Sequence, residues 1–135
     1  EIAINPINAI NEDGKIVEIE GVEFKIPNSF SPDSEPTLDE DGNDIYGNSV
    51  HLYAIYYLGE NEDISIGTTT RYSEPFTQDD ALDAGGNVET INGKTGKLKK
   101  EADTLYVFSY VENGVKVMLQ SENLELIKYC TNTTN

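Results

Sequence analysis

The segment that decides the fold is TLYVFSYVENGVKVMLQSENLELIKYC, residues 104–130. Its Asn113 and Gly114 are typical of a two-residue type I′ turn, because both central residues of that turn have positive φ. The turn places Glu112 opposite Val115. The register that follows pairs Tyr110 with Val117, Phe108 with Leu119, and Tyr106 with Ser121.

The two faces of this hairpin differ in character. A slip of one residue would move the whole aromatic set to the opposite face, so the core itself fixes the register. The apolar face carries Tyr106, Phe108, Tyr110, Val115, Val117 and Leu119. The mixed face carries Val107, Ser109, Val111, Lys116, Met118 and Gln120. Ser121 is placed to cap a C-terminal helix, which docks on the sheet through Leu124, Leu126 and Ile127.

Other alternating runs predict further strands. Residues 15–20 and 22–26 are two short runs separated by Gly21. Residues 50–58 have two largely apolar faces, which favours a central position, and residues 64–70 are predicted as the antiparallel partner.

A second Asn-Gly pair, at 92 and 93, predicts a hairpin of residues 88–91 and 95–99. Residues 77–84 predict a short helix capped by Thr77. The fold prediction is therefore α+β: a mostly antiparallel β-sheet of about six strands, with a C-terminal helix and one short additional helix packed on it. An all-β sandwich with a terminal helix is the alternative.

The remaining segments complete a single domain over residues 1–135. Residues 1–10 are predicted as an extended lead-in that Pro6 interrupts. The isoleucines of this segment must be buried against other residues. The segment could lie along the domain's own sheet edge, which we favour, or along a neighbouring copy as a donated strand. Residues 28–48 are predicted as a long acidic loop, and residues 131–135 as a polar tail.

Composition narrows the possible partners. The chain has 25 acidic and nine basic residues, giving a net charge of −16. Such a surface repels phosphates and anionic lipid, so we expect no nucleic acid among its partners. The longest apolar stretch, residues 52–58, is far shorter than a membrane span, so we expect no membrane insertion within this segment. Cys130 is the only cysteine, so an intrachain disulfide is impossible. The chain begins at Glu1 rather than Met, which we interpret as removal of a signal peptide, an anchor, a tag or a neighbouring domain.

The acidic loop contains the best candidate for a metal site. Calcium binds several oxygen ligands in flexible loops, and Asp39, Asp41, Asn43 and Asp44 could supply them. The match to an EF-hand loop is poor, because glycine stands at its fourth position and Val50 at its twelfth. A solvated acidic loop is the simpler alternative, and no other cofactor is predicted.

Three further features are candidates for chemistry or assembly. His51 is the only histidine and could act as a base, but no nucleophile accompanies it; a strand residue facing solvent or a tyrosine is the simpler interpretation. The lysines at 94, 97, 99 and 100 form a basic hairpin that could support head-to-tail association or be incidental surface charge. Asn132 begins an N-glycosylation pattern.

Three stretches carry a family resemblance: VEFKIPNSF (22–30), ETINGKTGKL (89–98), and YVFSYVENGVKVML (106–119) followed by ENLELIKYC (122–130). The chain resembles uncharacterised small extracytoplasmic domains of methanogenic archaea, which share an F-x-I-P-x-x-F start, an I-N-G-x-x-G hairpin and a closing strand–turn–strand–helix. The resemblance implies a secreted or membrane-tethered domain and carries over no catalytic residue.

These observations predict a non-enzymatic extracytoplasmic or cell-surface domain that binds an unknown protein partner or takes part in adhesion or assembly. One form of this hypothesis is a surface filament subunit that self-associates through residues 1–10. The alternatives are an acidic cytoplasmic inhibitor that mimics nucleic acid and, last, a hydrolase that uses His51 with the loop carboxylates.

Overall fold

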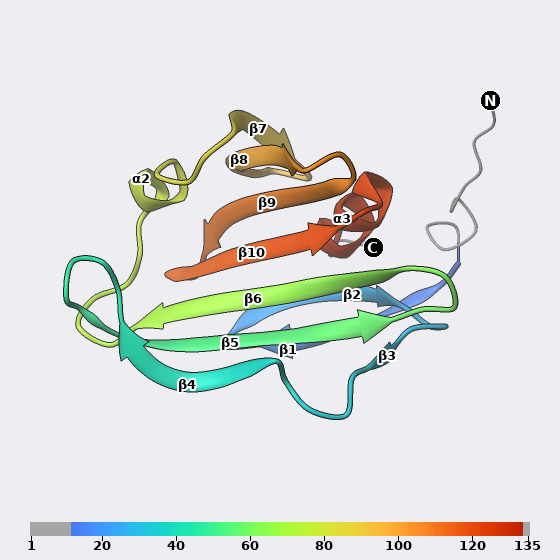
Figure 1. The fold of residues 1–135 in the computed structure, drawn as a ribbon, viewed down its shortest axis with the longest axis horizontal. Helices are drawn as coiled ribbons and strands as arrows, with labels where there is room; N and C mark the ends of the chain where they lie inside the picture. Colours follow the sequence, from blue (N-terminus) through green and yellow to red (C-terminus); the bar gives the residue numbers. More distant parts are fainter. Residues whose placement is uncertain (1–11, 134–135) are drawn as a thin grey trace.

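The computed structural model describes residues 12–133, which form ten strands and two helices (Figure 1). The strands are β1 (Gly14–Ile19), β2 (Val22–Pro27), β3 (Ser31–Pro32), β4 (Leu38–Asn43), β5 (Ser49–Leu58), β6 (Asp63–Arg71), β7 (Asn87–Ile91), β8 (Lys94–Glu101), β9 (Leu105–Glu112) and β10 (Val115–Ser121). The helices are α2 (Gln78–Ala81) and α3 (Leu124–Thr131). Neither helix of this part of the chain has the length and apolar character needed to cross a membrane.

All strand pairs are antiparallel. β1 and β2 form a two-stranded sheet, and the other strands form a large sheet in the order β3-β5-β6-β10-β9-β8-β7, with β4 also paired to β5. In Figure 1, β1 and β2 cross behind β5 and β6, and α3 packs against β2 and β10. The mostly antiparallel α+β prediction is therefore confirmed, whereas the strand count is higher than the six predicted.

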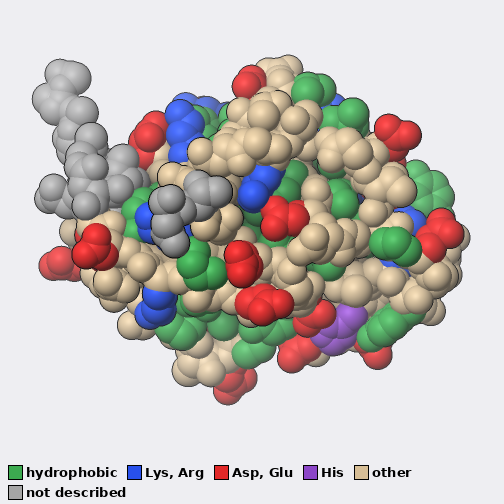
Figure 2. Space-filling view, turned by 180° about the vertical axis from the view of Figure 1, so that it is seen from behind, with side chains coloured by type: hydrophobic (Ala, Val, Ile, Leu, Met, Phe, Trp, Pro, Cys, Tyr) green, Lys and Arg blue, Asp and Glu red, His purple; other side chains and the backbone are tan. Residues whose placement is uncertain are grey.

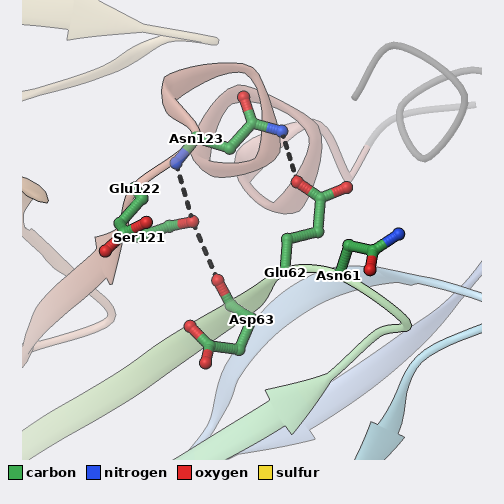
Figure 3. A pocket seen from close by; sticks show the side chains of 6 residues that line it. All are labelled: Asn61, Glu62, Asp63, Ser121, Glu122 and Asn123. Atoms are coloured by element: carbon green, nitrogen blue, oxygen red, sulfur yellow. Dashed lines mark hydrogen bonds between the residues drawn. The ribbon is translucent and has the colours of Figure 1, made fainter. Parts of the chain in front are cut away.

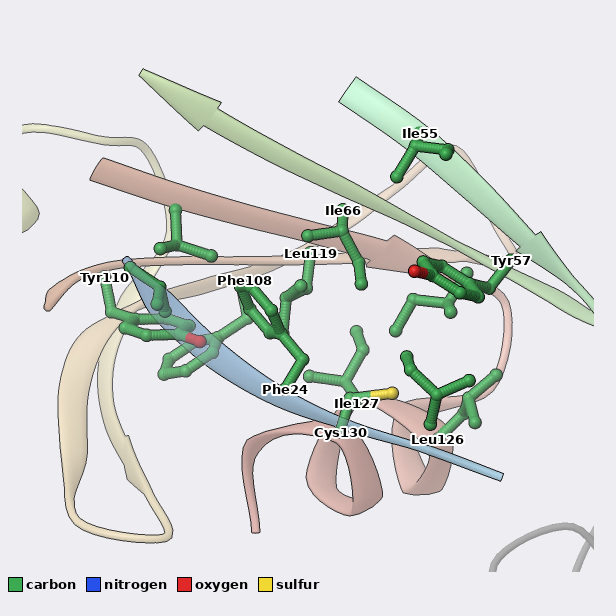
Figure 4. Close-up of a cluster of buried hydrophobic side chains, with 14 of the residues drawn as sticks. Phe24, Ile55, Tyr57, Ile66, Phe108, Tyr110, Leu119, Leu126, Ile127 and Cys130 are labelled. Carbon is green, nitrogen blue, oxygen red and sulfur yellow. The ribbon is translucent and has the colours of Figure 1, made fainter. Parts of the chain in front are cut away.

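The hydrophobic core lies between the large sheet and a second layer made of β2 and α3 (Figure 4). Phe24 projects from β2, and Leu126 and Ile127 project from α3, toward the sheet residues. Phe108 and Tyr110 are fully buried there, with ring centroids 5.2 Å apart. This layer explains why the aromatic face of the β9–β10 hairpin is the buried one.

The hairpin register is as predicted, from the pair Glu112 and Val115 to the pair Tyr106 and Ser121. The turn residues Asn113 and Gly114 have φ of 55° and 78°. The same conformation recurs at residues 92–93, between β7 and β8, and again at residues 20–21, between β1 and β2. Turn chemistry and alternation are both local, so the sequence predicted the hairpins at residues 92–93 and 113–114 directly. Residues 15–20 and 22–26 were predicted only as two runs separated by Gly21, and their pairing is a finding of the structure.

The expected long loop over residues 28–48 is wrong in part. Residues 38–43 form β4, which pairs along its whole length with β5, and Ser31 and Pro32 form the short β3. β4 is held by main-chain hydrogen bonds to β5, so this edge strand needs no alternating apolar residues. Its acidic side chains are typical of a loop, and for that reason the sequence did not indicate a strand here.

The ends of the helices also differ from prediction. The N-cap of α3 is Asn123, whose side chain accepts a hydrogen bond from Glu125 N at 3.0 Å, rather than Ser121. Helix α3 continues to Thr131, which is buried, so the polar tail begins later than residue 131. Thr77 is the N-cap of α2, as predicted, although this helix ends at Ala81. The lead-in over residues 1–10 lies outside the described residues.

Candidate functional site

His51 is held between two carboxylates of the neighbouring strand. It lies on β5 opposite Asp41 of β4, and Tyr53 lies opposite Asp39. Because alternate strand residues share a face, Asp39 and Asp41 both project on the side of His51. The His51 Nδ1 lies 2.8 Å from Asp41 Oδ1, and its Nε2 lies 2.8 Å from Asp39 Oδ1.

Tyr72, the residue after β6, completes this arrangement, which we call the His51 cluster (Asp39, Asp41, His51 and Tyr72). The Tyr72 hydroxyl donates a hydrogen bond to Asp41 Oδ1 at 2.7 Å. Ionised carboxylates only accept hydrogen bonds, so His51 satisfies both of its contacts when both ring nitrogens carry a proton. The cluster therefore favours the imidazolium form.

The pKa values follow from these contacts. The hydrogen bond to Asp41 is the main cause that raises the pKa of His51; burial opposes the rise, and the bond to Asp39 adds to it. The hydrogen bonds from His51 and Tyr72 lower the pKa of Asp41. The interactions thus favour the charged forms of both side chains.

The four predicted calcium ligands do not converge. Asp39 and Asp41 face His51, whereas Asp44 accepts hydrogen bonds from the main-chain N–H groups of Tyr46 and Asn48 at 2.9 Å each. Burial alone would raise the pKa of Asp44, but the bonds from Asn48 and Tyr46 lower it. No three His, Cys, Asp or Glu side chains within residues 12–133 are grouped to hold a metal ion. The calcium site stays a prediction.

The surface around the His51 cluster combines acidic and large apolar side chains. Ile45 and Tyr46, in the turn after β4, are 90% and 72% exposed, and Tyr72 is 61% exposed. In Figure 2 the single histidine, in purple, lies between red carboxylates and beside green side chains. We call this region the β4–β5 surface; its residues are Asp39, Asp41, Ile45, Tyr46 and Tyr72, whereas Glu40 projects from the opposite face of β4.

A polar hollow of about 320 Å³ lies where β6 begins and α3 begins (Figure 3). Its side chains are used in holding those elements together. Asn123 Nδ2 donates to Glu62 Oε1 at 2.8 Å, and Ser121 Oγ donates to the main-chain oxygen of Asp63 at 2.8 Å. The side chains that line the hollow therefore serve to join the start of β6 to the start of α3.

The remaining candidates have structural surroundings. Cys130 is fully buried in the core, and burial raises the pKa of its thiol, which makes the thiolate scarce. Asn132 is the C-cap of α3. Its glycosylation stays a prediction.

Each of the four clustered lysines lies on β8 and has a neighbour. Lys94 and Lys99 form ion pairs of 3.0 Å with Glu112 and Glu101. Lys97 Nζ lies 3.5 Å from the main-chain oxygen of Leu82, and Lys100 lies over the ring of Tyr106.

The sequence singled out Asp39 and Asp41 as calcium ligands, and it joined His51 to the loop carboxylates only in the hydrolase hypothesis, without predicting which carboxylates contact the ring. The signal that could have done so is the turn over residues 44–48, since closing it places Asp41 opposite His51. Comparisons of the chain with protein-family models, with curated proteins and with solved structures found no match. The functional argument therefore rests on the geometry of the chain itself.

Proposed function

We propose that this chain is a non-enzymatic interaction domain of a secreted or membrane-tethered protein, and that its β4–β5 surface binds a partner with a basic surface. The observation that carries this proposal is the combination of two exposed tyrosines with the fixed carboxylates of the His51 cluster. Tyrosine rings bind lysine and arginine cations on their faces, while carboxylates pair with the same groups.

The hydrogen bonds of the His51 cluster support binding rather than catalysis. They fix Asp41 and Tyr72 before a partner arrives, so little side-chain freedom is left to lose on association. A general base needs a nitrogen that can accept a proton, and both nitrogens of His51 are hydrogen-bonded to carboxylates. Cys130 is fully buried in the core, so its thiol is not exposed to solvent.

The location outside the cytoplasm is supported by the resemblance of residues 22–30 and 89–98 to extracytoplasmic archaeal domains. Fractionation of cells that express the complete gene tests it. We expect the protein in the secreted or membrane fraction. Recovery in the cytoplasm alone would favour the inhibitor hypothesis, whose partner is also basic.

The binding surface is tested with octa-arginine and octa-lysine peptides, followed by amide resonances. We expect saturable shifts confined to residues 38–51 and 70–74, with weaker binding as salt rises. Losing one cation–π contact is worth about 0.5–1 kcal/mol, so Tyr72→Ala should weaken binding about two- to fivefold. Tyr56→Ala is the matched control, because Tyr56 is also exposed but lies outside the β4–β5 surface. Small shifts spread over all acidic residues would contradict the proposal.

A further inference from the structure

The large sheet has two open edges within the described residues, and they lie at opposite borders of the molecule (Figure 1). At one border β4 pairs only with β5, and at the other β7 pairs only with β8. An open edge presents unpaired main-chain N–H and C=O groups to other chains. Proteins usually protect such an edge with charged side chains, proline or a bulge.

β7 carries little of this protection. Its sequence is NVETI, with a single charged residue and no proline, and Val88 is 58% exposed. Ile91 and Lys94 flank the two-residue turn and form a hydrogen-bonded pair. Hydrogen-bonded and non-hydrogen-bonded pairs alternate along an antiparallel ladder, so the main-chain N–H and C=O groups of Val88 and Thr90 point away from β8. Two residues of β7 are thus available to pair with another strand.

The surroundings of the two edges have opposite charge. Lys94, Lys97, Lys99 and Lys100 on β8, next to β7, are four of the nine basic residues of the chain. β4 exposes Asp39, Glu40 and Asp41. The strands also match in length, with five residues in β7 and six in β4. The only charged residue of β7 itself is Glu89, so the positive charge near this edge comes from β8. In a β7–β7 contact the lysines of the two β8 strands would repel each other, and in a β4–β4 contact the carboxylates would do so. The β7–β4 contact is therefore the one that brings opposite charges together.

We propose that β7 of one copy pairs with β4 of a second copy, which continues the large sheet from molecule to molecule. This inference rests on the proposed function, because it identifies the basic partner of the β4–β5 surface as the β7–β8 hairpin of another copy. The two surfaces differ, so the contact is head-to-tail and does not close on itself in a dimer. The product is an open chain of copies.

The contact is weak and depends on salt. A single pair of short strands buries less surface than a stable dimer requires. Two copies of net charge −16 also repel each other at low ionic strength. At about 0.15 M salt this repulsion is screened beyond about 8 Å, while charges in direct contact still attract. Association is therefore expected at high protein concentration and near physiological salt.

Sedimentation velocity from about 10 μM to 1 mM protein, at about 0.15 M salt, tests the inference. The expected result is an average mass that rises with concentration. Thr90→Pro removes an outward N–H without breaking the main-chain bonds to β8, and should abolish the rise. It also removes the bond of 2.7 Å between the hydroxyls of Thr90 and Thr95, so Thr90→Val, which removes the same bond but keeps the N–H, is the control. A monomer at the highest concentration, or a rise that Thr90→Pro leaves unchanged, would overturn the inference.

Charge reversal gives a sharper test. Glu40→Lys and Lys97→Glu should each weaken association about five- to tenfold, since each replaces an attraction of about 0.2–1 kcal/mol by a repulsion. An equimolar mixture of the two variants should associate again. Glu18→Lys and Lys15→Glu are the controls, because they make the same charge changes on β1, which belongs to the two-stranded sheet and not to the large sheet. Equal effects of the control and edge variants would show that net charge alone acts, and would overturn the inference.

The same preparations separate this inference from the proposed function. If the chain stays monomeric while octa-arginine still binds the β4–β5 surface, the inference fails and the proposed function stands. If octa-arginine does not bind there either, both fail. Thermal unfolding followed by circular dichroism confirms that each variant is folded before it is compared.

Discussion

Replacing Tyr110 by phenylalanine is expected to raise the free energy of unfolding. The ring of Tyr110 is fully buried beside Phe108, and its hydroxyl has no hydrogen-bond partner among the described residues. Burial is the main cause that raises the pKa of this hydroxyl, with Glu112 adding to it, so the group stays neutral. The side chain thus loses its hydrogen bond to water on folding and gains none in return.

The magnitude follows from that loss. A buried hydroxyl without a partner costs about 1–3 kcal/mol in mutational data. Tyr110→Phe removes this cost but keeps the ring and its contact with Phe108, and it gives up the dispersion contacts of one oxygen atom. We therefore expect a gain of about 1 kcal/mol, equivalent to a rise in Tm of roughly 3–5 °C for a chain of this length.

Tyr129→Phe is the matched control, because the same atom is removed where it is used. The Tyr129 hydroxyl donates to the main-chain oxygen of Glu12 at 2.8 Å. Its removal should lower the free energy of unfolding by about 0.5–1.5 kcal/mol. Urea unfolding followed by far-ultraviolet circular dichroism measures both variants. A loss of stability in Tyr110→Phe equal to that in Tyr129→Phe would refute the reasoning, since it would show that the Tyr110 hydroxyl is hydrogen-bonded in solution.

Phe108→Ala should lower the free energy of unfolding by about 3–5 kcal/mol, and a loss under about 1 kcal/mol in urea unfolding would contradict its place in the core. Gly114→Ala should destabilise the protein in the same assay, because φ is +78° and the new Cβ would lie 2.6 Å from the Pro75 Cβ; unchanged stability would contradict this. His51→Gln should lower the free energy of unfolding most between about pH 4 and 6.5. The pKa of His51 is raised, so its stabilising effect is lost as pH rises above this range, and the pKa of Asp41 is lowered, so its stabilising effect is lost as pH falls below it. A loss of stability that does not change with pH in unfolding curves would contradict the cluster. Calcium titration should shift the amide resonances of residues 38–48 saturably if the predicted site exists, and the shifts should vanish in Asp41→Ala; diffuse shifts would indicate counterion screening.

Local signals made much of the fold predictable. The Asn-Gly turns at residues 92–93 and 113–114 fixed two hairpins, because positive φ restricts both the residue types and the loop length. Alternation then assigned the buried face of the β9–β10 hairpin, as for Phe108 on β9. These features depend on neighbours close in the chain, and no long-range contact is needed to recognise them.

The second layer of the fold could not be predicted in this way. The β1–β2 hairpin packs across the large sheet, and Asn113 Nδ2 donates to the main-chain oxygen of Gly21, 92 residues away, at 2.9 Å. Tyr129 and Glu12 are joined over an even longer separation. Such contacts depend on how whole elements meet, which residue patterns do not encode. β4 was missed for a related reason, since its partner is the main chain of β5 rather than an apolar face.

The His51 cluster connects the stability of β4 with its availability to a partner. β4 is joined to the sheet only through β5 among the described strands, and the contacts of His51 with Asp39 and Asp41 add side-chain bonds to that single ladder. An edge strand that separates from its sheet cannot align its outer main-chain groups with another strand. The imidazolium thus favours an ordered β4 even though it cancels one of the negative charges that attract a basic partner. An ordered β4 is the first requirement for strand pairing, because the charges of Asp39, Glu40 and Asp41 can select a partner only when β4 is held in the sheet.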